Sequence, residues 1–121
     1  MIAPREISDH RVRRIIQLIE AHPKHRVKEL AEVVNLSASR LEHLFKEETG
    51  HRLSLYIQDQ KLEKARDLLL TTGMQVKEIS FNVGYEHAPS FVRAFKGKFS
   101  LTPKDYRGLN AYRFTTDNVV N

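Results

Sequence analysis

Apolar residues recur along this chain at intervals of three and four positions, which is the spacing of one face of an α-helix. The first such run lies between Asp9 and Pro23, and its apolar positions are Val12, Ile15, Ile16 and Ile19. Ser8 or Asp9 can cap this helix, and Pro23 ends it because proline cannot continue the helical hydrogen-bond ladder. The alternating pattern of a strand is missing from the sequence, so we predict an all-α fold.

Six further helices follow from the same pattern and from the residue types that begin and end helices. Ser37 caps the third and Gly50 closes it, while Thr102 caps the seventh with Pro103 at its first position. The longest, Leu53–Leu70, has an apolar stripe of Leu55, Tyr56, Leu62, Ala65, Leu68 and Leu69. The remaining predicted ranges are Val27–Val34, Ala38–Glu48, Val76–Val83 and Pro89–Lys98, followed by a tail of residues 109–121 without a clear period.

Two stretches of the chain repeat one another: VKELAEVVNLSASRLEHLF (residues 27–45) and VKEISFNVGYEHAPSFVRAF (residues 76–95). In each, a short helix leads to Asn35 or Gly84, which tolerate the positive φ of a tight turn, and then to a second helix. The small residues Ala31 and Ser80 allow the two helices to approach closely. This order of constraints is typical of a helix-turn-helix, whose second helix enters the major groove of DNA.

The duplication predicts two helix-turn-helix subdomains, residues 8–50 and 75–108, joined by a connecting helix over residues 53–72. At 1.5 Å per residue, the run Leu53–Leu70 would be about 27 Å long. Successive major grooves on one face of B-DNA lie about 34 Å apart, so we expect both second helices to reach adjacent grooves of one duplex. Bending the DNA to make up the difference would cost about 1–6 kcal/mol.

The chain has 121 residues, a formal net charge of +5 and no cysteine. A basic balance favours a polyanionic partner such as nucleic acid, and a basic domain without such a partner is the alternative. The absence of cysteine excludes disulfides, thiolate metal sites and a cysteine nucleophile, and it suits the reducing cytoplasm. No apolar run is long enough to span a membrane. Neither a nucleophile–base pair nor a phosphate loop is present, so we do not expect an enzyme or a cofactor.

The second repeat and its sequel, ISFNVGYEHAPSFVRAFKGKFSLTPKDYR, resemble the AraC/XylS family of bacterial transcription regulators. The matching positions are Ile79, Gly84, Tyr85, Phe91, Arg93, Phe95, Lys96, Phe99, Thr102, Pro103, Tyr106 and Arg107. SRLEHLFKEETG (residues 39–50) and KLEKARDLLLTT (residues 61–72) also fit, so the resemblance covers nearly the whole chain. It departs from the family at Ser80, where alanine is usual, at Ser100, where glycine is usual, and at Lys61, where arginine is common.

The resemblance implies a DNA-binding domain of seven helices that regulates transcription, usually by activation through contact with RNA polymerase. Many members carry a separate ligand-sensing domain, which these residues do not contain. If the chain is a fragment of a longer regulator, such a domain is expected outside it, and no small-molecule site is expected within it.

Residues on the outer faces of the second helices are the candidates for contact with DNA bases. They are Ser39, Arg40, Glu42 and His43 in the first copy and His87, Ala88 and Arg93 in the second. Arginine can bond guanine through two hydrogen bonds, and glutamate can accept from cytosine. A solvated helix face is the alternative for the first set. For Arg93 the alternatives are an ordinary surface arginine or an ion pair with Glu86 or Asp105. Because alanine and proline begin the second helix, we expect little base reading from it.

Charge suggests a division of labour between the two copies. Residues 27–48 contain three basic and five acidic residues, whereas residues 76–107 contain six basic and three acidic ones. We therefore expect the second copy to hold the DNA backbone and the first to read the sequence. The candidates for backbone contact are Ser37, Ser90, Lys96, Lys98, Thr102 and Lys104.

Other chemistries have weaker support in the sequence. His22 and His25 lack a third ligand nearby, so a metal site is not expected, and Glu47 and Glu48 are expected to be solvated at a helix end. The phenylalanines could stack bases of single-stranded DNA, but their helical spacing favours a core. A protein-interaction module with weak DNA affinity is the alternative function, motivated by the acidic residues Glu42, Glu47 and Glu48.

Overall fold

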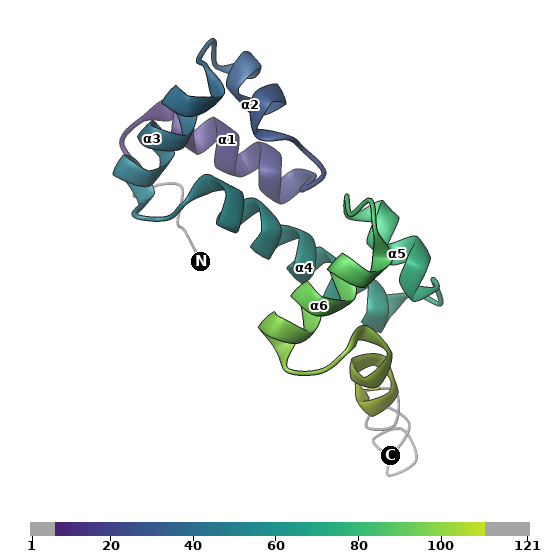
Figure 1. Cartoon of the computed structure of the whole chain (residues 1–121). Coiled ribbons are helices and arrows are strands. Elements are labelled where there is room, and N and C mark those ends of the chain that lie inside the picture. Colours follow the sequence, from purple (N-terminus) through teal and green to yellow (C-terminus); the bar gives the residue numbers. More distant parts are fainter. Residues whose placement is uncertain (1–6, 111–121) are drawn as a thin grey trace. The chain divides into compact units, whose positions relative to one another are not determined.

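The computed structural model of the chain describes residues 7–110, and every element in that range is a helix (Figure 1). A seventh helix begins at residue 103 and continues to residue 110. The prediction of an all-α fold with seven helices is therefore confirmed.

The seventh helix is longer than predicted. Residues 109 and 110 are helical, so the predicted tail starts too early, and residues 111–121 lie outside the described range. The other six helices are α1 (His10–Ala21), α2 (Val27–Val33), α3 (Ala38–Thr49), α4 (Leu53–Thr71), α5 (Val76–Asn82) and α6 (Ala88–Phe99).

The helices form two compact units, the first ending at Lys61 and the second beginning at Leu62, so the division falls inside α4. Each unit has its own hydrophobic core. The predicted subdomain limits, residues 8–50 and 75–108, remain predictions. None of the helices between residues 7 and 110 is both long and apolar enough to cross a membrane.

The first core is built from α1, α2, α3 and the beginning of α4. The four apolar positions predicted for α1 are all fully buried, and Leu41 and Phe45 of α3 are buried against them. Burying side chains of this size contributes about 1.5–3 kcal/mol each. The complete set of buried core residues is Ile7, Val12, Ile15, Ile16, Ile19, Leu30, Ala31, Leu41, Phe45, Leu53, Tyr56 and Ile57.

The second core is dominated by aromatic rings. Phe91 and Phe95 are fully buried, and Phe95 contacts the rings of Phe99 and Tyr106 at centroid distances of 4.6 and 5.5 Å. Ring pairs at this separation add to the energy of burial. Phe45 is likewise fully buried in the first unit. These rings are core residues, so stacking on the bases of a single strand is not their role.

The turn between the short first helix and the longer second helix of each copy contains an equivalent hydrogen bond. The Leu36 amide donates to Ala31 O and the Tyr85 amide donates to Ser80 O, both at 2.9 Å. The central residues, Asn35 (φ 58°) and Gly84 (φ 104°), have the left-handed conformation that a Schellman motif requires. The internal repeat seen in the sequence is therefore a repeat of backbone geometry.

The ends of α3 and α6 match in geometry but not in residue type. Gly50 (φ 77°) and Ser100 (φ 68°) both have left-handed backbone, and their amides donate to Lys46 O and Lys96 O at 2.8 Å. Glycine adopts this conformation without strain, whereas serine does not. A Cβ built on Gly50 meets no atom within 4 Å, so only the backbone distinguishes the two residues there.

Exchanging these two residue types is expected to change stability in opposite directions. Ser100→Gly should raise the free energy of unfolding by about 0.5–1 kcal/mol, because relief of strain exceeds the added freedom of the unfolded chain. Gly50→Ser should lower it by a similar amount. Urea denaturation of both variants at one temperature measures the two values. A loss of stability in Ser100→Gly would show that the serine side chain contributes more than its strained backbone costs.

The N-terminus of α1 is held by α3 as well as by its own cap. The Glu48 carboxylate accepts hydrogen bonds from Ser8 Oγ at 3.1 Å and from the Asp9 amide at 2.9 Å. Glu48 is half-buried. The expectation of a solvated carboxylate is therefore wrong for Glu48, because the unpaired donors ahead of α1 attract a negative charge.

Asp9 caps α1 and forms an ion pair with Arg11. Its carboxylate accepts from the Arg11 amide and from Arg11 Nη2, both at 2.8 Å. The side-chain hydrogen bond from Arg11 lowers the pKa of Asp9 from 3.8 to about 2. A carboxyl group with a lowered folded-state pKa stabilises the fold above its unfolded pKa, and this contribution is lost as pH falls through the folded value.

Replacing Asp9 by asparagine is expected to make stability less dependent on pH. Asparagine can still accept the capping hydrogen bond but does not titrate. The difference in free energy of unfolding between wild type and Asp9→Asn should therefore shrink between pH 4 and pH 2. Chemical denaturation at a series of pH values measures this difference, and a difference that stays constant over the range would contradict the assignment.

The predicted apolar stripe of α4 is partly wrong. Leu55 is 55% exposed, whereas Leu53 and Ile57 are buried in the first core. The later positions Leu62, Ala65 and Leu69 are buried in the second core, as predicted. A single periodic stripe cannot describe a helix whose two halves contribute to two separate cores.

Arg107 fastens the seventh helix to the end of α4. Its guanidinium donates to Leu69 O at 3.0 Å, to Thr72 O at 3.2 Å and to Met74 O at 2.7 Å. These carbonyls lie at and beyond the C-terminus of α4, where carbonyl groups have no helical partner. Arg107 therefore has a structural role, and its charge is not free for an outside partner.

Candidate nucleic-acid interface

The four predicted base-contacting residues of the first copy lie together on the outer face of α3. Ser39, Arg40, Glu42 and His43 are all exposed, while Leu41 and Phe45 of the same helix are fully buried. Ser37 accepts a hydrogen bond from the Arg40 amide at 3.1 Å and so caps the helix. The sequence from Ser37 to Phe45 thus produces a helix with one buried face and one polar face.

The acidic residues of α3 differ in how they are engaged. Glu47 lies 3.4 Å from His43 Nε2 and forms an ion pair with it when the imidazole is protonated. Glu48 is used at the N-terminus of α1. Within residues 7–110, Arg40 forms no ion pair. Among the described residues, the outer face of α3 therefore offers the unpaired guanidinium of Arg40, the carboxylate of Glu42 and the imidazole ring of His43.

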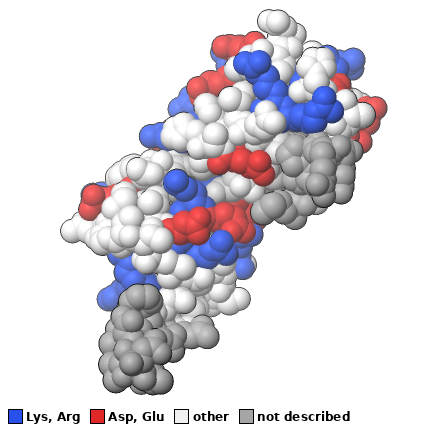
Figure 2. Space-filling view, turned by 180° about the vertical axis from the view of Figure 1, so that it is seen from behind, with Lys and Arg blue, Asp and Glu red and all other residues white. Residues whose placement is uncertain are grey.

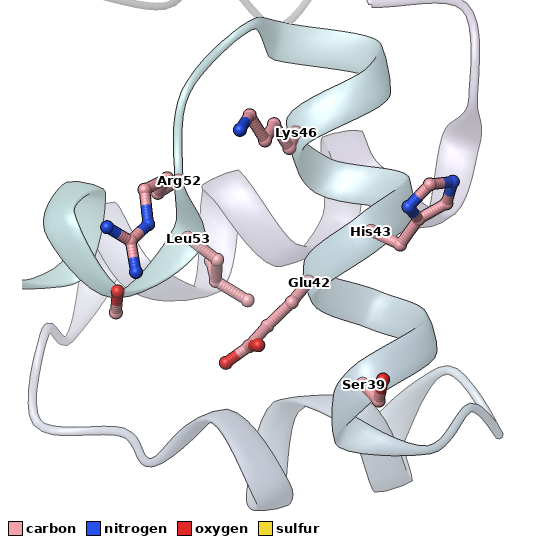
Figure 3. Close-up of a pocket in the computed structure, with 7 residues that line it drawn as sticks. Ser39, Glu42, His43, Lys46, Arg52 and Leu53 are labelled. Atoms are coloured by element: carbon pink, nitrogen blue, oxygen red, sulfur yellow. The ribbon is translucent and has the colours of Figure 1, made fainter.

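A pocket of about 260 Å³ lies between α3 and the beginning of α4, within the first unit. Figure 3 shows Lys46 and Arg52 at the end of this space near the α3–α4 connection, with Ser39 farther along α3. Lys46, Arg52 and the hydroxyl group of Ser54 lie close to the first amides of α4. Two cations and a hydroxyl group in this position suit a phosphate oxygen. The pocket is lined by Ser39, Glu42, His43, Lys46, Arg52, Leu53 and Ser54.

Three of these residues, Lys46, Arg52 and Ser54, were not among the candidates found from the sequence. All three are exposed side chains at the pocket. A signal for them existed, because basic residues in the last turn of one helix and just before the next would lie close together across a short connection.

The second copy presents a less polar helix. His87 is the N-cap of α6 but makes no side-chain capping bond, and proline follows in the first turn. Ala88 and Ser90 are half-buried, whereas His87 and Arg93 are exposed. Among the described residues Arg93 pairs with neither Glu86 nor Asp105, so the ion pair considered as an alternative is not formed.

The predicted backbone-contacting residues are dispersed over the second unit, apart from Ser37. Lys96 and Lys104 are exposed. Thr102 Oγ1 accepts from the Asp105 amide at 3.1 Å, which confirms its capping role. Lys98 Nζ lies 3.5 Å from Glu63 and 5.4 Å from the centroid of the Phe99 ring, so it already has partners within its unit.

On the face of the molecule that Figure 2 shows, charges of both signs are mixed. Lysine and arginine side chains on this face are interspersed with acidic ones over both units.

The two histidines considered as a metal site lie close together. The rings of His22 and His25 are 5.5 Å apart. Within residues 7–110, no group of three or more histidine or acidic side chains is arranged to hold a metal ion.

A family model described as a helix-turn-helix domain matches residues 30–108 of the chain. Among curated proteins, the xylose operon regulatory protein of Escherichia coli (strain K12) is 37% identical over 109 residues, which are 88% of this chain and 28% of that protein. The arabinose operon regulatory protein of the same strain is 34% identical over 102 residues, 82% of this chain and 35% of that protein. The chain thus spans about a third or less of either relative.

Among solved structures, the C-terminal domain of AraT, a response regulator from Geobacillus stearothermophilus, is similar in fold and sequence. The TM-score is 0.76 with 31% sequence identity, and the alignment covers 84% of this chain and 86% of that domain. The likeness therefore extends over nearly the whole of a separately solved domain.

Proposed function

The chain belongs to the AraC/XylS family of helix-turn-helix transcription regulators, and from this we propose that it binds duplex DNA sequence-specifically and regulates transcription. The observation that carries the proposal is the outer face of α3, which follows a Schellman turn and presents Arg40 free of any ion pair among the described residues. Arginine on such a helix bonds the major-groove edge of guanine. Operon regulation by the xylose and arabinose relatives is consistent with this role.

We propose that α3 reads the sequence and that the second unit holds the backbone. Ser39, Arg40, Glu42 and His43 are the base-contacting set, and Lys46 with Arg52 binds a phosphate beside it. On α6, Ala88 offers at most a contact with a thymine methyl, and Pro89 has no amide to donate. His87 and Arg93 are its candidates for base contact, and Ser37, Ser90, Lys96, Lys98, Thr102 and Lys104 are those for the backbone.

We also propose that one chain contacts two major grooves of a single duplex. The reading helices α3 and α6 would enter successive major grooves, because α4 provides 19 residues of helix at about 1.5 Å each.

The family also suggests how the chain acts on transcription. We propose that it activates transcription in the cytoplasm by contacting RNA polymerase. We also propose that the full regulator has a ligand-sensing domain outside this chain. A reporter gene with the bound site upstream of its promoter would separate activation from repression.

The alternative of a protein-interaction module has lost part of its motivation. It rested on Glu42, Glu47 and Glu48 as an acidic surface. Glu47 lies within pairing distance of His43, and Glu48 bonds the start of α1. Of these three residues, Glu42 alone has no partner within residues 7–110, and it also suits a base contact with cytosine.

Measuring the binding of two single variants to a library of DNA sites tests whether α3 reads the sequence and the second unit holds the backbone. Arg40→Ala should relax the preference at one or two base positions and cost about 1–3 kcal/mol on the preferred site. Lys96→Ala should weaken all sites about equally and reduce the salt dependence by one contact. A larger change of sequence preference in Lys96→Ala than in Arg40→Ala would reject the assignment.

A further inference from the structure

Gly97 lies in the last turn of α6, where neither the backbone nor the packing calls for glycine. It is exposed, its φ is not positive, and a Cβ built on it meets no atom within 4 Å. Glycine weakens a helix relative to alanine because it orders more backbone on folding. The part of the fold described by residues 7–110 therefore gives no reason for a glycine at this position.

The first copy of the repeat carries a different residue at the matching place. The register that aligns Lys46 with Lys96 also aligns Glu47 with Gly97 and His43 with Arg93. In α3 the Glu47 carboxylate lies 3.4 Å from His43. In α6 the glycine leaves Arg93 without this carboxylate one turn ahead.

Arg93, Lys96 and Gly97 share one face of α6, since Lys96 and Gly97 lie three and four positions after Arg93 along the helix. Arg93 and Lys96 give this face its positive charge. Within residues 7–110, neither Arg93 nor Lys96 forms an ion pair, and all three positions are exposed. Lys98 is separate from this face because it contacts Glu63 and the Phe99 ring. The unpaired charges of Arg93 and Lys96 therefore lie next to Gly97, a position where no side chain covers the helix backbone.

Resting on the proposed function, we propose that Gly97 is where the sugar–phosphate backbone of duplex DNA approaches α6 directly, with Arg93 and Lys96 bonding the adjacent phosphates. This assigns Arg93 to the DNA backbone in place of the base contact considered above. Glycine is the residue that permits such close approach of a helix to a ligand. The C-terminus of a helix carries roughly half a negative charge, which opposes a phosphate. Two full positive charges exceed it. The second unit then holds DNA at the end of α6, away from Ala88 and Pro89.

A pair of glycine-to-alanine variants separates contact with DNA from effects on the helix. Gly97→Ala and the control Gly108→Ala both place a methyl group on an exposed helical glycine of the second unit whose Cβ has open space. Both should raise the thermal midpoint. Dissociation constants are measured by fluorescence anisotropy on a selected operator and on a random duplex, each at two salt concentrations.

We expect Gly97→Ala to bind both duplexes about tenfold more weakly, with the salt slope lower by about one, and Gly108→Ala to bind as wild type does. Gly97→Glu should weaken binding more, because its carboxylate would repel phosphate. If Gly97→Ala binds both duplexes as tightly as wild type, or loses affinity for the operator only, close approach of the backbone is overturned while DNA binding stands. If wild type binds neither duplex, the proposed function itself fails.

Discussion

Arg107→Met is expected to lower the free energy of unfolding of the second unit by about 3–5 kcal/mol. The guanidinium makes three hydrogen bonds to carbonyl groups at and beyond the C-terminus of α4, at 2.7 to 3.2 Å. Hydrogen bonds from a charged group contribute about 1.5–3 kcal/mol each when a buried partner would otherwise be left unpaired. Because the side chain is half-buried and not fully enclosed, water recovers part of this loss. The free energy of unfolding of a typical domain is only about 5–15 kcal/mol in total, so this loss is a large fraction of it.

Amide hydrogen exchange resolved by residue measures this loss and locates it. Protection should fall most in the seventh helix and at the C-terminal end of α4, which Arg107 joins, and Arg107→Lys should retain part of it, since an ammonium group can bond fewer of the three carbonyls. A decrease below about 1 kcal/mol in Arg107→Met would mean that water satisfies these carbonyls equally well.

Removing the two cations of the α3–α4 pocket is expected to weaken DNA binding about 30- to 150-fold. Lys46→Gln combined with Arg52→Gln takes away two contacts to phosphate, each contributing about 1–1.5 kcal/mol. The slope of log affinity against log salt should fall by about two. Sequence preference should persist, because the base-reading face of α3 is unchanged.

A double variant with the same change of charge is the control. Arg14 and Lys24 are exposed cations of the first unit that do not line the pocket. Arg14→Gln combined with Lys24→Gln should therefore change affinity only a few-fold through the overall field. Equal losses in the two double variants would attribute the effect to net charge instead of the pocket.

The sequence predicted those features of the fold that depend on local chemistry. The buried face of α1, the cap at Ser37 and the left-handed turns at Asn35 and Gly84 follow from spacing and residue type. The face of α3 with Arg40 and His43 followed from the same periodicity. Local patterns decide these features because each involves residues within one or two helical turns of one another.

What the sequence did not predict depends on contacts between distant segments. Glu48 bonds Ser8, which is 40 positions away, and Arg107 bonds Leu69, which is 38 positions away. Neither charge differs in sequence from a solvated one. The same holds for the first half of α4, where Leu53 and not Leu55 is buried because the core of the first unit requires that face. The pocket at Lys46 and Arg52 is a different case, because these two cations flank one short connection between helices and their proximity is a local feature that the sequence does carry.

Equilibrium binding of the chain to a duplex selected from random DNA, compared with an unselected duplex at two salt concentrations, tests the central claim most directly. We expect affinity for both to fall steeply as salt rises, and the selected duplex to remain bound at least about a thousandfold more tightly. Affinity that is insensitive to salt and equal for the two duplexes would contradict sequence-specific DNA binding by α3.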